Sequence, residues 1–242
     1  MTRLRFIHTA DIHLGSFLPS SIESIIETAT LEGFSRVCDV AIDNDVDFLI
    51  ISGDLYDREA ASVKALRFFV EQCRRLKEAN IDVMVIAGNH DPLREQQDLF
   101  EIPSNVKIFR GDKPEVFEVL DKGEKPLARI IGQSYQSRWE RRKIHLEYRV
   151  PDTDLWNIAL LHTQLEPGRS NYVPCSLSEL KERSDIHYWA LGHIHQPKIL
   201  NDTYSLIAYP GIPQGRDFGE QDRGGCMLVE LDPSDVGSIS FI

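Results

Sequence analysis

The chain has 242 residues, of which 42% are hydrophobic and 27% are charged. A chain of this size buries roughly 70–75% of its unfolded surface, which excludes a disordered or fibrous protein. Its 38 acidic and 27 basic residues give a net charge of −11, which argues against a protein that coats nucleic acid with a uniformly basic surface.

The first half of the chain alternates strand-like and helix-like segments. The expected elements are a strand at 4–10, a helix that opens at Ser20/Ser21 and runs from Ile22 to Ala41, a strand at 47–52, a helix from Val63 to Leu76 and a strand at 83–87. This βαβαβ order predicts a parallel sheet inside helical layers. Such sheets bind ligands outside the carboxyl ends of their strands.

After Pro103 the chain turns to shorter strand-like runs separated by turn signals. We expect strands at 106–109, 116–120, 128–131, 156–161, 188–191, 204–208, 226–231 and 238–242, with a helix near 177–183. There is no repeat, linker or low-complexity stretch. The sequence therefore predicts one α/β domain over residues 1–242, with two facing sheets flanked by helices and no second domain evident.

The chain enters its first strand without an apolar leader, and no later stretch approaches ~18 uncharged apolar residues. The four cysteines form no Cys-x-x-Cys pair, which is typical of a reducing compartment. These features predict a soluble cytoplasmic protein with no membrane partner.

Side chains of the types that bind metals gather just beyond the predicted strand ends. Five of the eight histidines lie there, and the full set is Asp11, His13, Asp54, Asp57, Asn89, His90, Asp91, His162, His193 and His195. Asp11 and His13 by themselves could cap a helix as well as bind a metal. They become candidate metal ligands because the other residues of the set occur at corresponding strand ends. Glycines beside several of these residues permit the tight turns that a crowded cluster requires.

The donor types narrow the chemistry of this site. Carboxylate, imidazole and amide oxygen without thiolate suit Mn, Fe or Zn and disfavour a structural thiolate zinc site. About seven donors with one shared carboxylate are too many for one ion and suit two ions ~3.5–4 Å apart. Such a pair activates a bridging water for in-line phosphoryl displacement, so the sequence predicts phosphoester hydrolysis.

These segments resemble the five motifs of the calcineurin-like metallophosphoesterases. The motif segments are Asp11-Ile12-His13, Gly53-Asp54-Leu55-Tyr56-Asp57, Gly88-Asn89-His90-Asp91, His162 and Gly192-His193-Ile194-His195. More narrowly, residues 8–15 and 192–197, with Tyr209-Pro210-Gly211 and residues 215–220, resemble the SbcD-type DNA repair exonucleases, the catalytic partners of SMC-like ATPases. The resemblance implies a sandwich of two mixed β-sheets and a DNA exo- or endonuclease with an SbcC-like ATPase partner.

The resemblance also implies roles for individual residues. Asp11, His13 and His195 would bind one ion, Asn89, His162 and His193 would bind the other, and Asp54 would bridge them. The two ions would activate the attacking hydroxide. The expected metal is Mn²⁺, with Fe or Zn as the alternatives. His90 would contact the phosphate and assist departure of the leaving oxygen, with Asp91 orienting it.

The sequence departs from the family pattern at two places. Eukaryotic and archaeal members commonly carry a histidine where this chain has Asp57, so we expect Asp57 to accept a hydrogen bond from a ligand histidine instead of binding metal. SbcD-like chains usually continue into DNA-capping and ATPase-binding segments, whereas this sequence ends at Ile242. A piece of a longer protein and a minimal member are both consistent with that.

Other polar residues have two interpretations each. His8 faces away from Asp11 by the period of two and is expected to be a hydrogen-bonded structural residue, while His145 and His187 are expected at the surface. Residues 138–149 carry five basic and two acidic side chains, with Trp139 and Tyr148 between them. This composition is typical of a segment that contacts phosphates and stacks on bases, and equally of a solvated loop. The candidate substrate contacts are Arg216, Tyr56 and Arg58, and Arg216 could instead pair with Asp217 or Glu220.

Two other functions stay open at this point. The five motifs also suit a phosphatase or nucleotide phosphodiesterase on small substrates, and a nuclease-like scaffold that assembles with a partner is a third interpretation. The intact ligand set argues against a protein that acts only as a scaffold. Unpaired carboxylates brought together without metal ions destabilise a fold, and a scaffold has no need to keep them. Strand polarity, exo- against endonuclease preference and the oligomeric state do not follow from the sequence.

Overall fold

Two six-stranded β-sheets organise the computed structural model, which describes residues 1–16, 29–57, 63–93, 101–121, 123–151, 154–165, 170–216, 219–220, 224–234 and 237–242. The first sheet, in spatial order, is β12 (Ser238–Phe241), β11 (Met227–Leu231), β1 (Leu4–Thr9), β2 (Phe48–Ser52), β3 (Asp82–Ile86) and β4 (Val106–Ile108). The second is β5 (Glu115–Leu120), β6 (Pro126–Gly132), β7 (Trp156–His162), β8 (Tyr188–Gly192), β10 (Leu206–Tyr209) and β9 (Lys198–Asn201). Both sheets mix parallel and antiparallel pairs, as expected.

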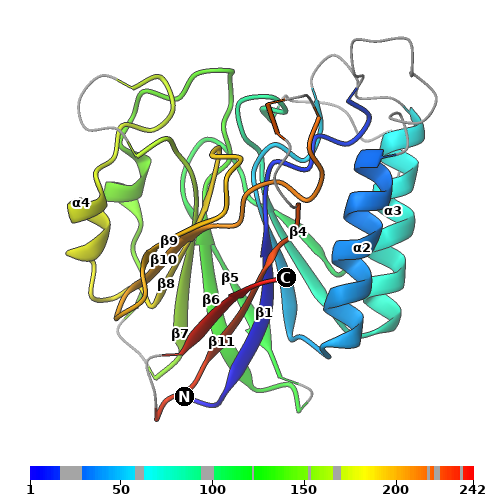
Figure 1. The fold of residues 1–242 in the computed structure, drawn as a ribbon. Coiled ribbons are helices and arrows are strands. Elements are labelled where there is room, and N and C mark those ends of the chain that lie inside the picture. Colours follow the sequence, from blue (N-terminus) through cyan, green and yellow to red (C-terminus); the bar gives the residue numbers. More distant parts are fainter. Residues whose placement is uncertain are drawn as a thin grey trace.

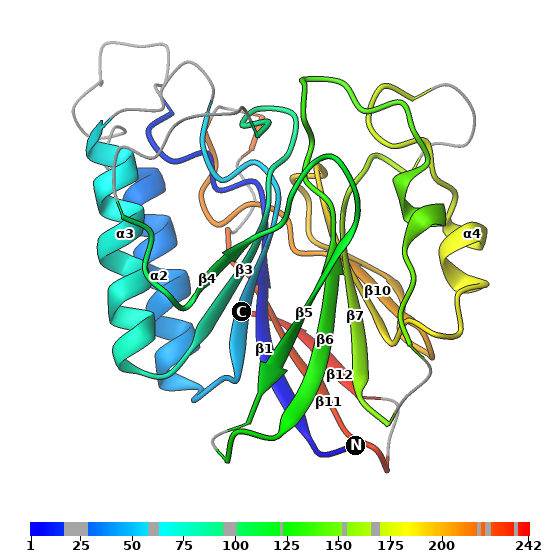
Figure 2. The same ribbon diagram turned by 180° about the vertical axis from the view of Figure 1, so that it is seen from behind.

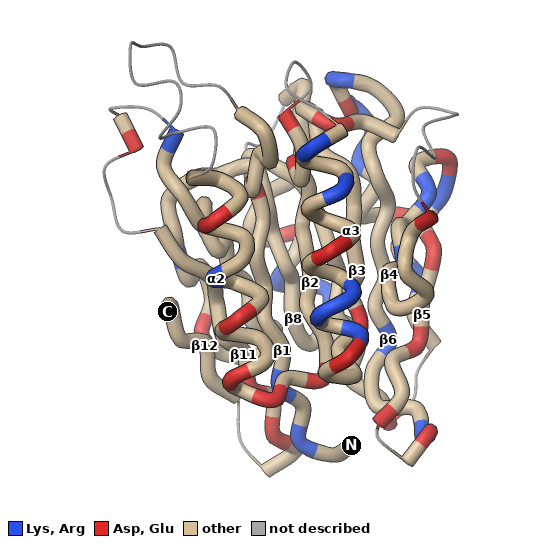
Figure 3. Tube along the Cα trace, turned by 90° about the vertical axis from the view of Figure 1, so that its right-hand side faces the viewer, with Lys and Arg blue, Asp and Glu red and all other residues tan. Residues whose placement is uncertain are grey.

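Helices α2 (Ala29–Asp43) and α3 (Val63–Glu78) cover the outer face of the first sheet (Figure 1). β2 is buried at all five positions, because a parallel strand packed on both faces needs a continuous apolar run. The rings of Phe34 and Phe69 lie 5.9 Å apart and help to join the two helices. Residues of both charge signs lie along α2 and α3 (Figure 3), and Arg75 pairs with Asp39 at 2.5 Å.

The inner faces of the two sheets share one apolar core. Phe6 of β1 stacks on Phe48 of β2 at 4.9 Å, and the ring of Tyr188 from β8 meets Phe6 edge-on at 5.2 Å. A further apolar cluster around Trp189 lies on the outer face of the second sheet. Helix α4 (Leu177–Lys181) lies over this face (Figure 2), together with the 3₁₀ helix η1 (Ile144–Glu147). The layers are therefore helices, sheet, sheet and short helices.

Parallel pairing directs many loops to one edge of this sandwich. β1, β2 and β3 run parallel in the first sheet, and β6, β7, β8 and β10 run parallel in the second. Their carboxyl ends lie together at the top of Figure 1. The loops that carry the candidate ligands therefore start from neighbouring strand ends of both sheets.

The predicted elements agree with the structure within one or two residues at most ends, and the fold class is confirmed. Two elements were missed, namely η1 and the edge strand β9, where Lys198 and Ile199 are exposed and alternation is weak. The expected helix starting at Ile22 is present from Ala29, and its residues 22–28 lie outside the described residues. Within the described segments, no helix is long and apolar enough to cross a membrane.

The expectation for His8 is confirmed, and that for His145 and His187 is wrong. His8 is buried between the Tyr188 hydroxyl at 2.8 Å and the Leu191 carbonyl at 3.1 Å. His145 and His187 are also buried. His145 lies in the short 3₁₀ helix that the sequence pattern did not reveal, and His187 precedes a strand and accepts a hydrogen bond from the Asn157 amide at 2.9 Å.

Acidification is expected to destabilise the fold through His8. Burial lowers the pKa of His8 from 6.5 to about 3, so the unfolded chain takes up a proton below 6.5 while the folded chain does not. Stability is therefore lost as pH falls, by about 2 kcal/mol from this residue between about pH 7.5 and about pH 5. Denaturant unfolding of ion-free protein at both pH values, for wild type and His8→Gln, measures the difference. An equal loss in the variant would contradict the assignment.

Candidate metal centre

The structure brings together the ligand-type residues that follow five strands of the two sheets. Asp11 and His13 follow β1, Asp54 and Asp57 follow β2, Asn89, His90 and Asp91 follow β3, His162 ends β7, and His193 and His195 follow β8. Residues from position 11 to position 195 thus meet at one edge of the sandwich. This convergence is a property of the parallel strand order.

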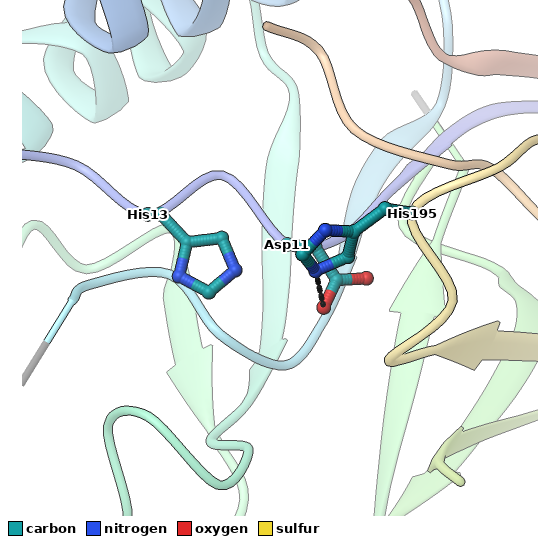
Figure 4. Close-up of side chains that lie close together, drawn as sticks. All are labelled: Asp11, His13 and His195. Carbon is teal, nitrogen blue, oxygen red and sulfur yellow. Dashed lines mark ion pairs between the residues drawn. The ribbon is translucent and has the colours of Figure 1, made fainter. Parts of the chain in front are cut away.

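Asp11, His13 and His195 form one group of potential ligands (Figure 4). One ligand atom from each lies within 4.8 Å of the others, and His195 Nε2 is 3.8 Å from Asp11 Oδ1. The other Asp11 oxygen, Oδ2, accepts a hydrogen bond from the His193 amide at 2.9 Å. The loop after β8 is therefore fastened to the loop after β1.

Asp54, His162 and His193 form a second group, joined by Asn89. The Asn89 side-chain oxygen lies 3.0 Å from His162 Nε2 and 3.0 Å from His193 Nδ1. His162 Nδ1 lies 2.8 Å from the Ser52 carbonyl, which fixes the ring so that Nε2 faces the cluster. The amide oxygen and the two imidazoles thus point at one place.

Asp54 lies between the two groups. Its Oδ2 is 3.9 Å from His13 Nε2 and 3.4 Å from His162 Nε2, while its Oδ1 accepts the His90 amide at 2.8 Å. A single carboxylate oxygen therefore faces a histidine from each group. This is the position that a bridging ligand requires.

The backbone at four of these residues is left-handed. Asp11, His13, Asp54 and His193 have φ values of 51°, 50°, 51° and 97°. Non-glycine residues adopt this region rarely, at a cost of about 1–3 kcal/mol each in strained cases, and such residues cluster at functional sites. Gly53 has φ of 98°, and a Cβ there would lie 2.3 Å from His162 Nδ1, so glycine is required beside the ligand.

The residues present fit divalent metal ions. Asp11 Oδ1 and both ring nitrogens of His13 are buried and have no hydrogen-bond partner among the described residues. Buried polar atoms almost always have partners, so these three atoms call for a ligand. The donors are oxygen and imidazole nitrogen with no thiolate, which suits Mn, Fe or Zn.

Burial and ion pairing set the charges in this cluster. Burial raises the pKa of Asp11 to about 6 and lowers the pKa of His193 to about 3. Burial opposes the charged form of His162, but the Asp54 carboxylate outweighs it and raises the pKa of His162 to about 9. Without ions, His162 therefore holds a proton beside Asp54, and binding of a divalent ion must release it.

The partner of His90 is Asp57, and our expectation for Asp91 is wrong. His90 Nδ1 lies 3.4 Å from Asp57 Oδ1, and this contact raises the pKa of His90. Asp91 instead accepts hydrogen bonds from three backbone amides, those of Gly88, Leu55 and Tyr56, at 2.8, 2.8 and 3.1 Å. Its carboxylate is used to join the loops after β2 and β3, and Asp57 faces the half-buried His90 ring. Asp57 thus contacts a histidine that is not among the seven expected ligands, and together with His13 this pair forms a further group of potential metal ligands.

The three candidate substrate contacts have different outcomes. Arg216 lies at the site, with Nη1 3.6 Å from Asp57 Oδ2 and Nη2 3.7 Å from Glu220 Oε1. Tyr56 is partly buried and packs its ring against Phe69 of α3, beside the apolar cluster under the first sheet, and a substrate role for it stays a prediction. Arg58 lies outside the described residues, as does Asp217, the other pairing partner considered for Arg216.

Glu220 is a site residue that sequence analysis considered only as a partner of Arg216. Its Oε1 forms a short hydrogen bond with His195 Nδ1, and its Oε2 accepts the Arg216 amide at 2.8 Å. The carboxylate thereby orients the candidate ligand His195. The sequence feature that could have identified Glu220 as a site residue is its position in the stretch 215–220, which resembles the SbcD type.

Replacing Glu220 by Gln is expected to weaken metal binding by about 10–100-fold, because the glutamine can hold the ring but does not increase the basicity of His195. Calorimetric titration of Mn²⁺ into ion-free protein measures this. Glu71, an exposed residue of α3, provides the matched Glu→Gln control and should leave the affinity unchanged. Equal affinities of wild type and Glu220→Gln would rule out the orienting role.

Comparisons with known proteins agree with this geometry. Residues 4–197 match the model of the family described as calcineurin-like phosphoesterase. The chain is 36% identical over 244 residues to a Bacillus subtilis protein named "uncharacterized metallophosphoesterase YhaO", covering 98% of this chain and 59% of that protein. It is 26% identical over 242 residues to the "DNA double-strand break repair protein Mre11" of Archaeoglobus fulgidus, covering 91% of this chain and 52% of that protein. The chain thus spans little more than half the length of these relatives.

Solved structures show the same fold. A dimetal phosphatase from Danio rerio superposes with a TM-score of 0.60 at 11% identity, over 95% of this chain and 93% of that one. The protein TT1561 of Thermus thermophilus superposes with a TM-score of 0.56 at 14% identity, over 100% of this chain and 99% of that one. At these identities the likeness concerns the fold alone.

Proposed function

The chain belongs to the calcineurin-like phosphoesterase family, and from this premise we propose that it is a two-metal phosphodiesterase that cleaves DNA. The observation that carries the proposal is the position of Asp54 Oδ2 between His13 and His162, which joins two ligand groups into one centre. The choice of DNA is supported by several relatives named as DNA double-strand break repair proteins. It is also supported by the segments that resemble the SbcD type.

We assign the ligands as follows. Asp11, His13 and His195 would hold one ion, Asn89, His162 and His193 would hold the other, and Asp54 would serve both. When bound, the two ions supply Lewis acidity toward the phosphate and an activated water. Mn²⁺ is the ion we would test first, since the donor set is oxygen and imidazole.

The protein's own groups then act on the substrate. His90 has 37% of its side chain exposed, and it carries a proton more readily because Asp57 faces its Nδ1. We assign to this residue the contact with the phosphate and proton donation to the leaving oxygen. Arg216 lies beside Asp57 and would offset the negative charge of the diester.

We further propose a partner and a place of action. The net charge of −11 limits non-specific affinity for DNA, so an SbcC-like SMC-type ATPase would supply much of the binding energy. All four cysteines are buried and unpaired, which suits a cytoplasmic protein. The sheets share one core, so we treat residues 1–242 as a single catalytic domain.

The test is cleavage of labelled single- and double-stranded DNA in Mn²⁺, beside a small aryl phosphodiester and a free nucleotide. Metal-dependent DNA cleavage that is lost in EDTA would support the proposal. Turnover of the free nucleotide far above that of DNA would favour the small-substrate phosphodiesterase. Failure to hydrolyse any phosphodiester with two ions bound would overturn the enzymatic assignment.

A further inference from the structure

The loop between β6 and β7 starts at the metal centre. Tyr135, just after β6, donates from its amide to the Ala87 carbonyl at 3.0 Å, and its hydroxyl donates to the His162 carbonyl at 2.7 Å. The first of these contacts lies at the end of β3 and the second at a candidate ligand. Figure 2 shows this loop rising above the second sheet at the edge where the strand ends meet. Its root is therefore fixed relative to the reacting centre.

The middle of the loop is also fastened beside the centre. Glu140 pairs with Tyr172 in a short parallel bridge, with Glu140 N to Asn171 O at 2.8 Å and Val173 N to Glu140 O at 2.7 Å. The Tyr172 ring in turn lies on the His193 ring, with centroids 4.4 Å apart. Segment 138–141 is thus held to the metal centre through Tyr172.

Trp139 stands exposed on this fixed segment. It is 53% exposed, whereas Trp156 and Trp189 are 6% and 0% exposed. The guanidinium of Arg141 lies 6.0 Å from the centre of the Trp139 ring, and Arg141 Nε donates to Asn171 at 2.9 Å. Indole rings in folded proteins are normally packed against apolar groups. An exposed indole on a segment that is fastened by hydrogen bonds is therefore a candidate surface for binding a ligand.

Arg141, which lies beside this ring, and Arg138, which precedes Trp139 in the sequence, have no acidic partner among the described residues. Within the part of the chain that the structure describes, neither Arg138 nor Arg141 forms an ion pair with a carboxylate. By contrast, Arg142 pairs with Glu140 at 2.7 Å and Lys143 pairs with Glu179 at 2.5 Å. In a chain with excess acid, uncompensated positive charge next to an aromatic ring suits a phosphate chain with bases.

We propose that Trp139, Arg138 and Arg141 form a site that binds single-stranded nucleic acid and leads it to the metal centre, with a base stacked on the indole. This deepens the proposed function and rests on it for the direction of the strand. Tyr148, which the sequence also offered as a stacking residue, is fully buried and takes no part. The cations and the fixed link through Tyr172 favour nucleic acid over a protein partner at this surface.

Tryptophan fluorescence gives a direct readout. A thymidine oligonucleotide, titrated in Ca²⁺ so that binding is separated from turnover, should quench the emission of Trp139, because the other two tryptophans are buried. For the variants, affinity is measured by the anisotropy of a dye-labelled oligonucleotide: Trp139→Ala should weaken binding about 10-fold or more, and Trp139→Phe should restore part of it. Arg141→Ala should weaken binding and lower the salt dependence of the affinity by about one phosphate contact.

Tyr204→Ala is the matched control, since Tyr204 is 57% exposed and lies just before β10, away from the carboxyl ends of the strands. It should leave oligonucleotide affinity unchanged. Absence of quenching, or equal affinity of wild type and Trp139→Ala, would overturn the site and leave this surface to a protein partner. Hydrolysis of the small diester by wild type reports on the proposed function separately, so failure of one proposal is distinguishable from failure of the other.

Discussion

Replacing Asp54 by Asn is expected to reduce phosphodiester hydrolysis by about 1,000-fold or more. The substitution keeps the size of the side chain but removes the negative charge that faces His13 at 3.9 Å and His162 at 3.4 Å. Four histidines, Asn89 and Asp11 would then have to hold two divalent cations with one carboxylate fewer. We expect bound Mn²⁺, measured by elemental analysis after gel filtration, to fall below two ions per chain.

The stability of the ion-free protein separates this effect from misfolding. Asp54 is buried, and its desolvation is offset mainly by His162, which keeps the pKa of Asp54 well below its usual range. Asp54→Asn should therefore fold in EDTA but gain little on addition of Mn²⁺. Wild type should gain about 2.7 kcal/mol for each bound ion at a free Mn²⁺ concentration 100 times the dissociation constant of that site. A variant that keeps two ions and near wild-type turnover would refute the bridging role.

The positions of the ligands were predictable because strand ends are visible in sequence. Apolar runs such as 48–52 and 188–192 are buried strands, and the histidines and carboxylates that follow them have to emerge at the carboxyl edge. The structure places all seven expected ligands there. Glycine was informative for a related reason, since a Cβ at Gly53 would lie 2.3 Å from His162 Nδ1 and a Cβ at Gly88 would lie 2.3 Å from Asp54 Oδ1, both in side chains of expected ligands.

Contacts made between distant loops could not be read in the same way. His90 and Asp57 are 33 positions apart, and Glu220 and His195 are 25 apart, so neither pair has a local spacing that identifies it. Asp91 stands next to His90 in the chain and appeared to be its partner. Its carboxylate turns to backbone amides instead, because the loop turns at that point and leaves the amides of Gly88, Leu55 and Tyr56 without strand partners.

Burial of polar rings was the other weak point of sequence analysis. Tyr56 and Tyr148 stand next to charged residues in the sequence. In the fold, Tyr148 lies within the apolar cluster on the outer face of the second sheet, and Tyr56 packs, partly buried, against the cluster on the outer face of the first. Tyr148 satisfies its hydroxyl by donating to the Leu160 carbonyl at 2.7 Å. A tyrosine with such a backbone acceptor can be buried at low cost, and that acceptor comes from a strand that is 12 positions away.

Replacing His90 by Ala is expected to lower DNA hydrolysis by about 10²–10⁴-fold while both ions stay bound. His90 is near the ligands without belonging to either ligand group, and its ring lies edge-on to His13 at 4.7 Å with 37% of the side chain exposed. Loss of the ring removes a proton donor and a phosphate contact but no metal donor. Elemental analysis should therefore give two ions per chain for this variant.

The leaving group discriminates between the two roles of His90. An alkoxide of DNA needs a proton as it departs, whereas an aryl oxide with an acidic conjugate phenol leaves without one. If His90 donates that proton, His90→Ala should impair DNA far more than an activated aryl diester. Asp57→Asn should show the same selectivity in weaker form, since Asp57 raises the pKa of His90. Electrostatic stabilisation of the phosphate does not depend on the leaving group. Equal losses of activity on both substrates would therefore contradict proton donation by His90 and would assign it only a contact with the phosphate.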